Sequence, residues 1–338
     1  MNQDKYDLTT YSEGVLDSLK EMGQGKLYGL SPYIRMQAIV YNADLFKKHG
    51  VDLPRDGMTW QEILDTARRF PTDGSDNERI YGFGLRDGLT LSALANGIAV
   101  TEGLAAYNGN TGQVTMNTDS WKETYKLALD AISSKSVHEK TEGGHANGPM
   151  SMEDYIATQP FLMGRTAMTM ANISLVDDIN NLEDLGLDLK GAKSFEVGLV
   201  AGPVSHAEPN KTSSSYIDQI FSLYTGSLNK EVAWDFIKYA NSEELAKVKS
   251  KMIAQGISSR VGVSKEYNGY SLESLHKLGP KLLPDYGVDK IPEGFLQQHS
   301  EILSRESELI KNNKKSIEEA LKTIQNESQV TLDQLSKN

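Results

Sequence analysis

The 338-residue sequence contains no cysteine, which excludes disulfide bonds, thiolate zinc sites and cysteine nucleophiles. It also lacks any apolar run close to the roughly 18–20 residues that a membrane-spanning helix needs. Basic residues are in the minority, because 35 Lys and Arg stand against 46 Asp and Glu and give a net charge of −11 at pH 7. Such a charge repels polyanions, so the composition argues against nucleic-acid binding.

Recognisable enzyme motifs are equally scarce. The nucleophile motif G-x-S-x-G is absent. Gly82, Gly84 and Gly88 follow a strand-like run, but their spacing misses G-x-G-x-x-G and no P-loop lysine follows. An E-x-x-H pair, Glu142 and His145, lies in a glycine-rich loop and not on a helix. We therefore expect no cofactor, no metal centre and no catalytic activity.

The run Asp73–Asn77 places oxygen-bearing side chains at alternate positions, as a calcium-binding loop does. No glutamate stands at the twelfth position, where such a loop needs its bidentate ligand. We interpret the run as a solvated turn. Calcium binding remains the alternative.

Several helices are indicated by capping residues followed by apolar periodicity. Thr59 with Glu62, and Ser120 with Glu123, have the spacing of a capping box. Strand-like runs alternate with the helices and predict an α/β architecture. The expected strands cover residues 38–42, 80–85, 166–170, 195–200 and 218–224.

Two further helices are expected at residues 230–248 and 316–335. In the first, the periodicity places Ala233, Phe236, Ile237 and Ala240 on one apolar face. The three tryptophans also fall on helical stripes, where packing in the core is the favoured interpretation over stacking on a ligand. They are Trp60, Trp121 and Trp234.

The length favours two lobes, since single cores rarely serve much more than about 150 residues. The polar, proline-containing loop at 203–215 is the better candidate for a crossing between them.

One long segment carries a specific resemblance. Residues 25–70, "GKLYGLSPYIRMQAIVYNADLFKKHGVDLPRDGMTWQEILDTARRF", combine a G-K-x-Y-G-L start, an apolar strand ending in Y-N, a D-L-F helix and a T-W-x-E cap. In order and spacing they resemble bacterial extracellular solute-binding proteins of the sugar-binding ABC-importer type. "FLMGRTAMTMANIS", "FEVGLVAGPV", "LNKEVAWDFIKYANSEE" and "ISSRVGV" continue the resemblance in register over nearly the whole chain.

The resemblance implies a periplasmic-binding-protein-like, type II clamshell of two α/β lobes. It implies that residues 1–38 and 214–262 belong to the first lobe, and 39–213 and 263–338 to the second. Family members begin with a signal peptide and further β-α-β structure, so we expect the first lobe to be incomplete here. The export signal or lipidation cysteine of the family has no counterpart in "MNQDKYDLTTYSEG".

The same resemblance implies which residues line the cleft. Tyr33, Arg35 and Gln37 alternate along an extended segment before the apolar strand, so they are candidates to face the solute. For Arg35, two interpretations stay open: recognition of an anionic sugar such as a uronate, and a salt bridge between the lobes.

The other candidates follow later strands. Arg86 and Asp87 align with a turn at the cleft edge, although a plain solvated loop is the alternative. Asn172 and Ser174 occupy the place where many sugar binders carry a stacking tryptophan. Tyr216 and Asp218 follow the second crossing and complete the expected ligand-binding set, although packing at the hinge is the alternative for Tyr216.

The function implied is that of the binding component of an ABC importer. The expected partners are a carbohydrate, either an oligosaccharide or a sugar derivative, and the transmembrane permease subunits, with the protein acting as a monomer outside the cytoplasmic membrane. Two alternatives remain: a carbohydrate-active hydrolase that uses cleft carboxylates, and a truncated chain that binds nothing.

Overall fold

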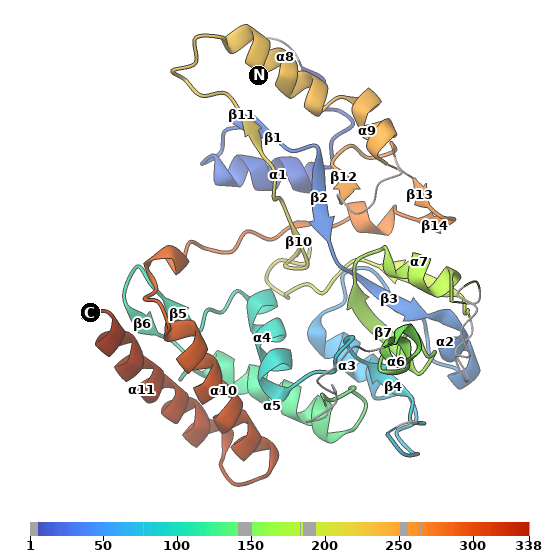
Figure 1. The fold of residues 1–338 in the computed structure, drawn as a ribbon, viewed down its shortest axis with the longest axis vertical. Coiled ribbons are helices and arrows are strands. Elements are labelled where there is room, and N and C mark those ends of the chain that lie inside the picture. Colours follow the sequence, from blue (N-terminus) through green and yellow to red (C-terminus); the bar gives the residue numbers. More distant parts are fainter. Residues whose placement is uncertain are drawn as a thin grey trace.

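The computed structural model of the chain describes residues 6–76, 78–140, 151–182, 184, 194–250, 256–263 and 265–337. Two regions lie one above the other along the long axis (Figure 1). We call residues 6–36, 214–250 and 256–263 the small region. We call residues 38–76, 78–140, 151–182, 194–212 and 281–337 the large region. Residues 265–280 form a connecting segment between them.

The large region is built on a four-stranded sheet in the order β4-β7-β3-β8, with β4 parallel to β7 and β3 antiparallel to both of its neighbours. Consecutive β-branched residues, Ile39 and Val40, are fully buried in β3, as expected for a strand covered on both faces. The strands are β3 (Ala38–Asn42), β4 (Tyr81–Phe83), β7 (Thr166–Ala171) and β8 (Val197–Val200).

Helices pack around this sheet and are mostly capped as the sequence predicts. Thr59 and Glu62 form the expected capping box at α3, but the second predicted box is wrong: Thr118, not Ser120, accepts the hydrogen bond from Trp121 N that caps α5. The helices are α2 (Ala43–His49), α3 (Trp60–Ala67), α4 (Leu91–Glu102), α5 (Asp119–Ser133), α6 (Met152–Ala157) and α7 (Leu175–Asn180), with a small hairpin of β5 (Tyr107–Asn108) and β6 (Gln113–Val114).

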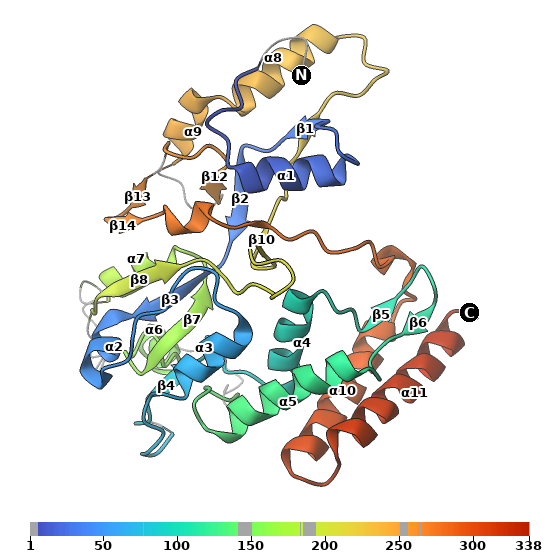
Figure 2. The same cartoon turned by 180° about the vertical axis from the view of Figure 1, so that it is seen from behind.

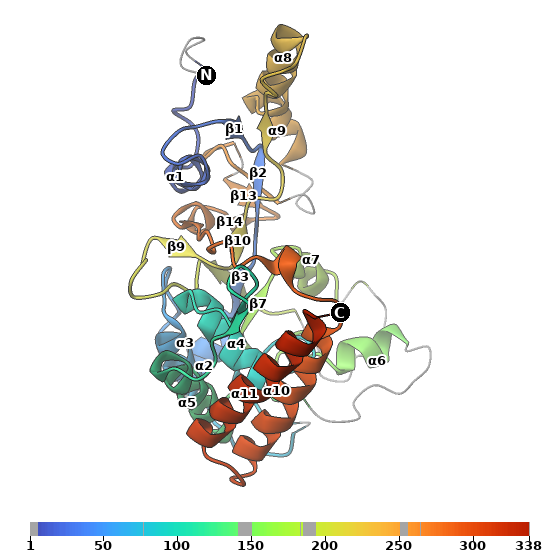
Figure 3. The same cartoon turned by 90° about the vertical axis from the view of Figure 1, so that its left-hand side faces the viewer.

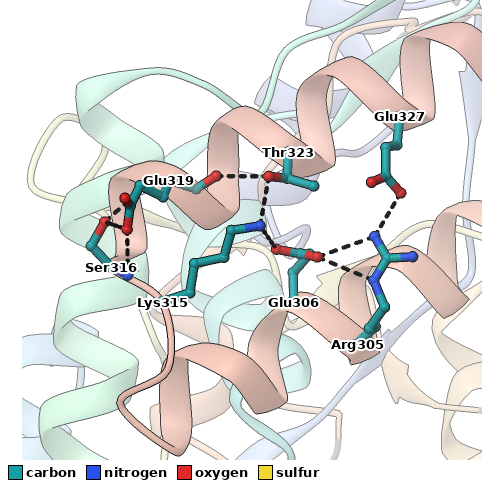
Figure 4. Close-up of polar contacts among 7 residues, drawn as sticks. All are labelled: Arg305, Glu306, Lys315, Ser316, Glu319, Thr323 and Glu327. Carbon is teal, nitrogen blue, oxygen red and sulfur yellow. Dashed lines mark hydrogen bonds and ion pairs between the residues drawn. The ribbon is translucent and has the colours of Figure 1, made fainter.

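A helical hairpin, α10 (Phe295–Lys311) and α11 (Ile317–Leu335), closes the large region on one side (Figure 3). Leu321 and Ile324 of α11 are fully buried in the main core. The buried carboxylate of Glu306 accepts hydrogen bonds from Lys315 Nζ at 2.6 Å and Arg305 Nε at 3.1 Å (Figure 4). Lys315 also donates to Thr323 Oγ1 at 2.7 Å, so Glu306, Lys315 and Thr323 form one hydrogen-bonded group between the helices.

The small region is assembled from segments that are distant in sequence. Its central strand, β2, pairs antiparallel with β10 on one side and β12 on the other, while β1 pairs only with β11 in the described residues. Its elements are α1 (Glu13–Met22), β1 (Gly29–Leu30), β2 (Tyr33–Met36), β10 (Ser215–Tyr216), β11 (Phe221–Ser222), α8 (Lys230–Ala240), α9 (Glu243–Lys249) and β12 (Ile257–Ser258).

A buried arginine joins three of these segments. Arg260 donates from Nε to the Asn241 carbonyl at 2.8 Å and from Nη2 to Tyr6 Oη at 2.8 Å, and it also hydrogen-bonds Thr10. Its guanidinium lies 4.6 Å from the ring centroid of Tyr11, within range of a cation–π interaction. The start of the described chain, the end of α8 and the loop after β12 are therefore tied to one cation.

The connecting segment lies between the two regions. It contains β13 (Glu266–Tyr267), β14 (Tyr270–Ser271), η2 (Ser274–His276) and β15 (Gly279–Pro280), and β15 pairs parallel with β9 (Lys211–Thr212). Beyond it, a long loop with η3 (Val288–Lys290) leads to α10. Leu272, Leu275 and Leu278 share one buried cluster with residues of α1, β2, β3 and β8. This cluster connects the regions by packing as well as by chain.

In the described part of the chain, none of the helices combines the length and apolar character needed to cross a bilayer.

Candidate functional site

The candidate site begins at one extended run of backbone, Tyr33–Asn42, which passes from the small region to the large one (Figure 2). Its first part is β2, in the sheet with β10 and β12; its second part is β3, in the four-stranded sheet. Gln37 lies between the two, and its backbone N–H donates to the Ser214 carbonyl at 2.9 Å. Side chains along this run therefore lie where the regions meet.

Arg35 sits at the centre of a polar cluster on the small-region side. In the β2–β10 register it lies opposite Tyr216, so the two side chains project from the same face of the sheet. Its guanidinium Nε donates to Asp218 Oδ2 and forms an ion pair. The Arg35 side chain is 41% exposed and that of Asp218 24%, which leaves both reachable from solvent.

Tyr33 belongs to the same cluster but is buried. The ammonium of Lys249 on α9 lies over its ring, 5.8 Å from the centroid. Burial and, secondly, the negative charge of Asp218 raise the pKa of the Tyr33 phenol, so the hydroxyl stays protonated and able to donate at neutral pH. A small pocket beside this ring is lined by residues of α9 and β12, including Leu245, Lys249 and Ser258.

The alternation predicted along this segment is present. Ile34 and Met36 are buried in the cluster that joins the regions, whereas Arg35 is partly exposed and Gln37 exposed. The chain thus buries its apolar side chains on one side and presents polar ones on the other. Tyr33 departs from this pattern because α9 covers it.

A second group of candidate residues lies at one end of the strands of the large-region sheet. Ala38 pairs with Ala171, so the residues just beyond this pair, Gln37 before β3 and Asn172 after β7, are neighbours at the same end of the two strands. Asn172 is exposed, and Ser174 is also exposed at the start of α7, where its side chain makes no capping hydrogen bond. The amide and hydroxyl groups can donate to or accept from hydroxyl groups.

Arg86 and Asp87 follow β4, which runs parallel to β7, and so lie at the same edge of the sheet. Their charged groups are 3.6 Å apart and more than half exposed. Arg86 Nη1 donates to the hydroxyl of Tyr155 at 3.2 Å, and Tyr155 is itself 39% exposed. Sequence reasoning could not select Tyr155 or Lys249, because neither lies in a motif and each is brought to its partner only by the fold.

The structure therefore brings the predicted residues into two groups. Arg35 and Asp218 are in contact, Tyr33 and Tyr216 adjoin them, and the remaining residues lie along the upper edge of the large-region sheet. Loops at the carboxyl ends of parallel strands are frequent ligand sites in α/β folds. The arrangement offers hydrogen-bond donors, acceptors and exposed tyrosine rings, which are the groups that bind polyhydroxylated solutes.

No group of three or more metal-binding side chains occurs among the residues that the structure describes. In the turn at 73–76, Arg79 occupies the position that a cation would need: its guanidinium contacts Asp76 Oδ1 at 2.7 Å and donates to the carbonyls of Thr72 and Gly74 at 3.0 Å. This supports a solvated turn there, although Asn77 lies outside the described residues. So do Glu142 and His145.

Comparison with solved structures identifies the fold. The chain is similar to the sugar-binding protein MalE of Xanthomonas citri (14% identity, 98% of this chain and 77% of that one, TM-score 0.61) and to a sugar transporter protein of Rhizobium etli in an open conformation (19%, 97% and 77%, 0.60). An ABC substrate-binding protein of Listeria monocytogenes in complex with cycloalternan also matches (19%, 98% and 78%, 0.51). The predicted α/β fold of the periplasmic-binding-protein type is confirmed.

Sequence comparison reaches the family. The arabinooligosaccharide-binding protein of Bacillus subtilis is 26% identical over 121 residues, which are 36% of this chain and only 26% of that protein's length. A family model described as "Bacterial extracellular solute-binding protein" matches residues 2–247, nearly three quarters of the chain. That family is one of binding proteins, not enzymes, so the prediction of a non-enzymatic protein is confirmed. The chain belongs to the bacterial extracellular solute-binding protein family.

Proposed function

We propose that the chain binds a carbohydrate where the small and large regions meet, and presents it to the permease of an ABC importer. The observation that carries this proposal is the gathering of polar side chains around the run Tyr33–Asn42, which both sheets share. The family and the fold support it. On this proposal the protein acts outside the cytoplasmic membrane, as a monomer, with the permease subunits as its partners.

The proposed solute is a neutral sugar or sugar derivative. Arg35 already has a carboxylate partner in Asp218, so the pair presents one acceptor and several donors with little net charge. Paired hydroxyls match such a donor and acceptor set, whereas a uronate would have to compete with Asp218 for the guanidinium. Arg35 does form a salt bridge, but not the bridge between the lobes that was the second interpretation of this residue, because Asp218 lies in the same region as Arg35.

The relatives do not narrow the solute further. Three solved neighbours are described with cycloalternan, α-D-tagatose or D-mannitol bound, and the relative from Bacillus subtilis is named for arabinooligosaccharides. These compounds range from a linear polyol to a cyclic oligosaccharide. Their shared feature is a dense set of hydroxyl groups, and that chemistry is what we assign to this site.

The lobe boundaries predicted from the sequence, 1–38 with 214–262 and 39–213 with 263–338, are retained as part of the proposal. The first crossing then falls at Gln37 and the second near Ser214, whose backbone groups are hydrogen-bonded to each other. The connecting segment packs with elements of both regions. We propose that relative motion of the regions is therefore limited by this shared cluster.

Titration calorimetry with a panel of neutral monosaccharides, polyols, oligosaccharides and uronates tests the proposal. We expect one neutral class to bind and to be recovered unchanged. Loss of charge-assisted hydrogen bonds in Arg35→Ala should weaken that binding by roughly ten- to a hundredfold. Arg69→Ala is the matched control, because it removes a similar exposed pair, Arg69–Asp52 at 3.0 Å, that lies away from the site.

Each contrary outcome has a definite meaning. Binding of uronates alone would overturn the neutral-sugar assignment. Conversion of the sugar would contradict a binding role. No binding by a folded, monodisperse protein would support the alternative of a chain that binds nothing.

A further inference from the structure

The β13–β14 hairpin of the connecting segment lies beside helix α7 of the large region (Figures 1 and 2) and is fastened to it by side chains. Tyr267 Oη donates to Asp177 Oδ2 at 2.5 Å, and Asn268 Nδ2 donates to Asp177 Oδ1 at 2.6 Å. Tyr270 Oη donates to Asn180 Oδ1 at 3.1 Å. The hydrogen bond to Asp177 raises the pKa of Tyr267 to about 12, so its hydroxyl remains a donor at neutral pH. One carboxylate therefore receives two of these three hydrogen bonds.

The hairpin turns at Asn268 and Gly269. Tyr267 pairs with Tyr270, so these two residues form the whole loop, and both have a positive φ, 48° and 86°. Asn-Gly suits such a turn because both residues tolerate the left-handed conformation. Both are exposed, and a Cβ built on Gly269 would meet no atom within 4 Å. No hydrogen bond from the Gly269 N–H occurs among the described residues, so this amide is free as well as accessible.

An asparagine followed by a glycine with a free amide is chemically labile. The Gly269 nitrogen attacks Cγ of the Asn268 side chain: the N–Cγ bond forms, the Cγ–Nδ2 bond breaks, and ammonia leaves with the proton of the glycine N–H. Water then opens the five-membered imide at either carbonyl and leaves aspartate or isoaspartate. The attack requires Asn268 to rotate out of the left-handed region, and strands of two residues each oppose that rotation weakly.

The chain holds three other Asn-Gly pairs, and the two that the structure describes are protected. Gly97 lies inside α4, where its amide belongs to the helical hydrogen-bond ladder. Gly109 N–H donates to a backbone carbonyl at 2.7 Å, and a Cβ there would lie only 2.0 Å from a backbone oxygen. The pair at 147–148 lies outside the described residues. Of the described pairs, that at 268–269 alone presents a free and uncrowded amide.

We propose that Asn268 is a site of spontaneous deamidation, and that the carboxylate formed there releases the β13–β14 hairpin from α7. A side chain that donates to Asp177 is replaced by one of negative charge at the same place, so the contact changes from attractive to repulsive. Leu272 and Leu275, just after the hairpin, pack in the cluster that joins the two regions. The modification therefore acts beside this junction. The inference does not depend on the solute proposed above.

Incubation of the full 338-residue chain in mildly alkaline buffer, followed by peptide mass mapping, tests the modification. We expect conversion at Asn268 to be at least about tenfold faster than at Asn96 or Asn108, because their glycine amides must first give up a hydrogen bond and unpack. Both aspartate and isoaspartate should form, since the imide opens at either carbonyl. Equal conversion at the three sites would overturn the proposal. So would an Asn268 that stays intact while a free peptide of residues 265–271 converts, or a product that contains aspartate alone.

Two variants test the release. Asn268→Asp supplies the negative charge at once, and Asn268→Gly is the matched control, because it removes the same hydrogen bond without adding charge. Hydrogen exchange in the hairpin and in α7 should be about tenfold faster in Asn268→Asp than in Asn268→Gly. Adding Asp177→Asn to Asn268→Asp should restore slow exchange, since it removes the repulsion.

Circular dichroism of each variant checks that the fold is kept. Wild-type chain that has been deamidated by incubation gives the same exchange measurement without any substitution, and it should match Asn268→Asp. Equal exchange in Asn268→Asp and Asn268→Gly, or no recovery on adding Asp177→Asn, would overturn the release of the hairpin.

Discussion

The large and small regions differ in how completely each can bury its own apolar residues. The large region has a four-stranded sheet with helices around it and a main core that includes Phe46, Phe83 and Tyr125, all essentially inaccessible. The small region's separate core contains three buried apolar side chains, Tyr11, Leu30 and Ile237. Its other buried apolar side chains, such as Val15 and Ile34, lie in the cluster that it shares with the large region. A region with so small a core of its own gains less from burial within itself, so its folded state depends more on single polar contacts.

Stability is therefore unevenly distributed along this chain. Local openings are expected at lower free energy in the small region than in the large one, because it has fewer buried contacts and shorter strands. The run Tyr33–Asn42, which contributes β2 to one sheet and β3 to the other, links the two regions, yet it does not give them equal stability. Three changes test this difference in stability, beginning with the one that should cost the most free energy.

The largest effect is expected in the large-region core. Phe83 is fully buried and packs edge-to-face on Trp60, with centroids 5.6 Å apart. Phe83→Ala should lower the free energy of unfolding by about 3–5 kcal/mol, because it removes apolar contacts and leaves a cavity. Denaturant titration followed by tryptophan fluorescence measures this loss. Val330→Ala, at a 54% exposed position of α11, is the control and should change little. Equal effects of the two variants would show that the core is looser than described.

Acid should act on the large region first. Burial lowers the pKa of His299 to about 4, and its Nδ1 contacts Ser328 Oγ at 2.7 Å between α10 and α11. The unfolded chain, in which the histidine pKa is near 6.5, binds the proton more readily than the folded protein does. This contribution to stability is therefore complete above about pH 6.5 and is lost as the pH falls toward 4.

Each unit of pKa difference corresponds to about 1.4 kcal/mol, so the loss is of the order of 3 kcal/mol. Thermal unfolding of the wild type and of His299→Gln across pH 4–7 measures it. We expect the acid-dependent fall in melting temperature to be smaller in the variant. No histidine occurs in the small region, so the hydrogen exchange of its backbone amides should not respond to the protonation of His299. Identical pH profiles for the two proteins would contradict the prediction.

The smallest of these effects is expected from Arg260, but it should be the most selective. Arg260→Met removes hydrogen bonds to Asn241 and Tyr6, at a cost of about 1.5–3 kcal/mol. Hydrogen exchange should show faster exchange in α8, β12 and the segment 6–12, with the four-stranded sheet unchanged. Arg305→Met is the matched control, because its guanidinium is half exposed in the α10–α11 hairpin. Uniformly faster exchange throughout the chain would show that the regions unfold as one unit.

The two regions also differ in how much of their structure the sequence could predict. Elements of the large region follow from local signals: the run at 38–42 is β3 exactly, and Thr59 caps α3 as its spacing indicates. In the small region, the strand expected at 218–224 is reduced to Phe221–Ser222, and Phe236, predicted to share the buried face of its helix, is 55% exposed. Helical periodicity cannot tell which of two apolar faces finds a partner.

The tryptophans show the same division. Trp60 and Trp121 are buried in the large-region core as predicted, at 6% and 3% exposure. Trp234 is only partly buried and lies edge-on to Tyr6, 5.8 Å between centroids. A tryptophan on a helical stripe is buried only where the fold supplies a partner layer, and the small region supplies little.

For the site, alternation along one strand could select Arg35 and Gln37, because period two is a local property. It could not reveal that Asp218 neutralises Arg35, since 183 positions separate them. Nor could it show that α9 covers Tyr33 or that Tyr155 meets Arg86. These contacts depend on which strand pairs with which, and that information is spread over the whole chain.

The continuous run of β2, Gln37 and β3 has a mechanical consequence. The run from Tyr33 to Asn42 contains neither glycine nor proline, and it is hydrogen-bonded to neighbours on both sides of Gln37. Both halves of the run are therefore stiff, and any bending of the run is concentrated at Gln37, which acts as a pivot. Since α8 lies at the far tip of the molecule (Figures 1 and 3), a small rotation at that pivot is magnified along the length of the small region. Within the range that the shared cluster allows, such a rotation displaces Arg35, two residues from the pivot, far less than it displaces α8.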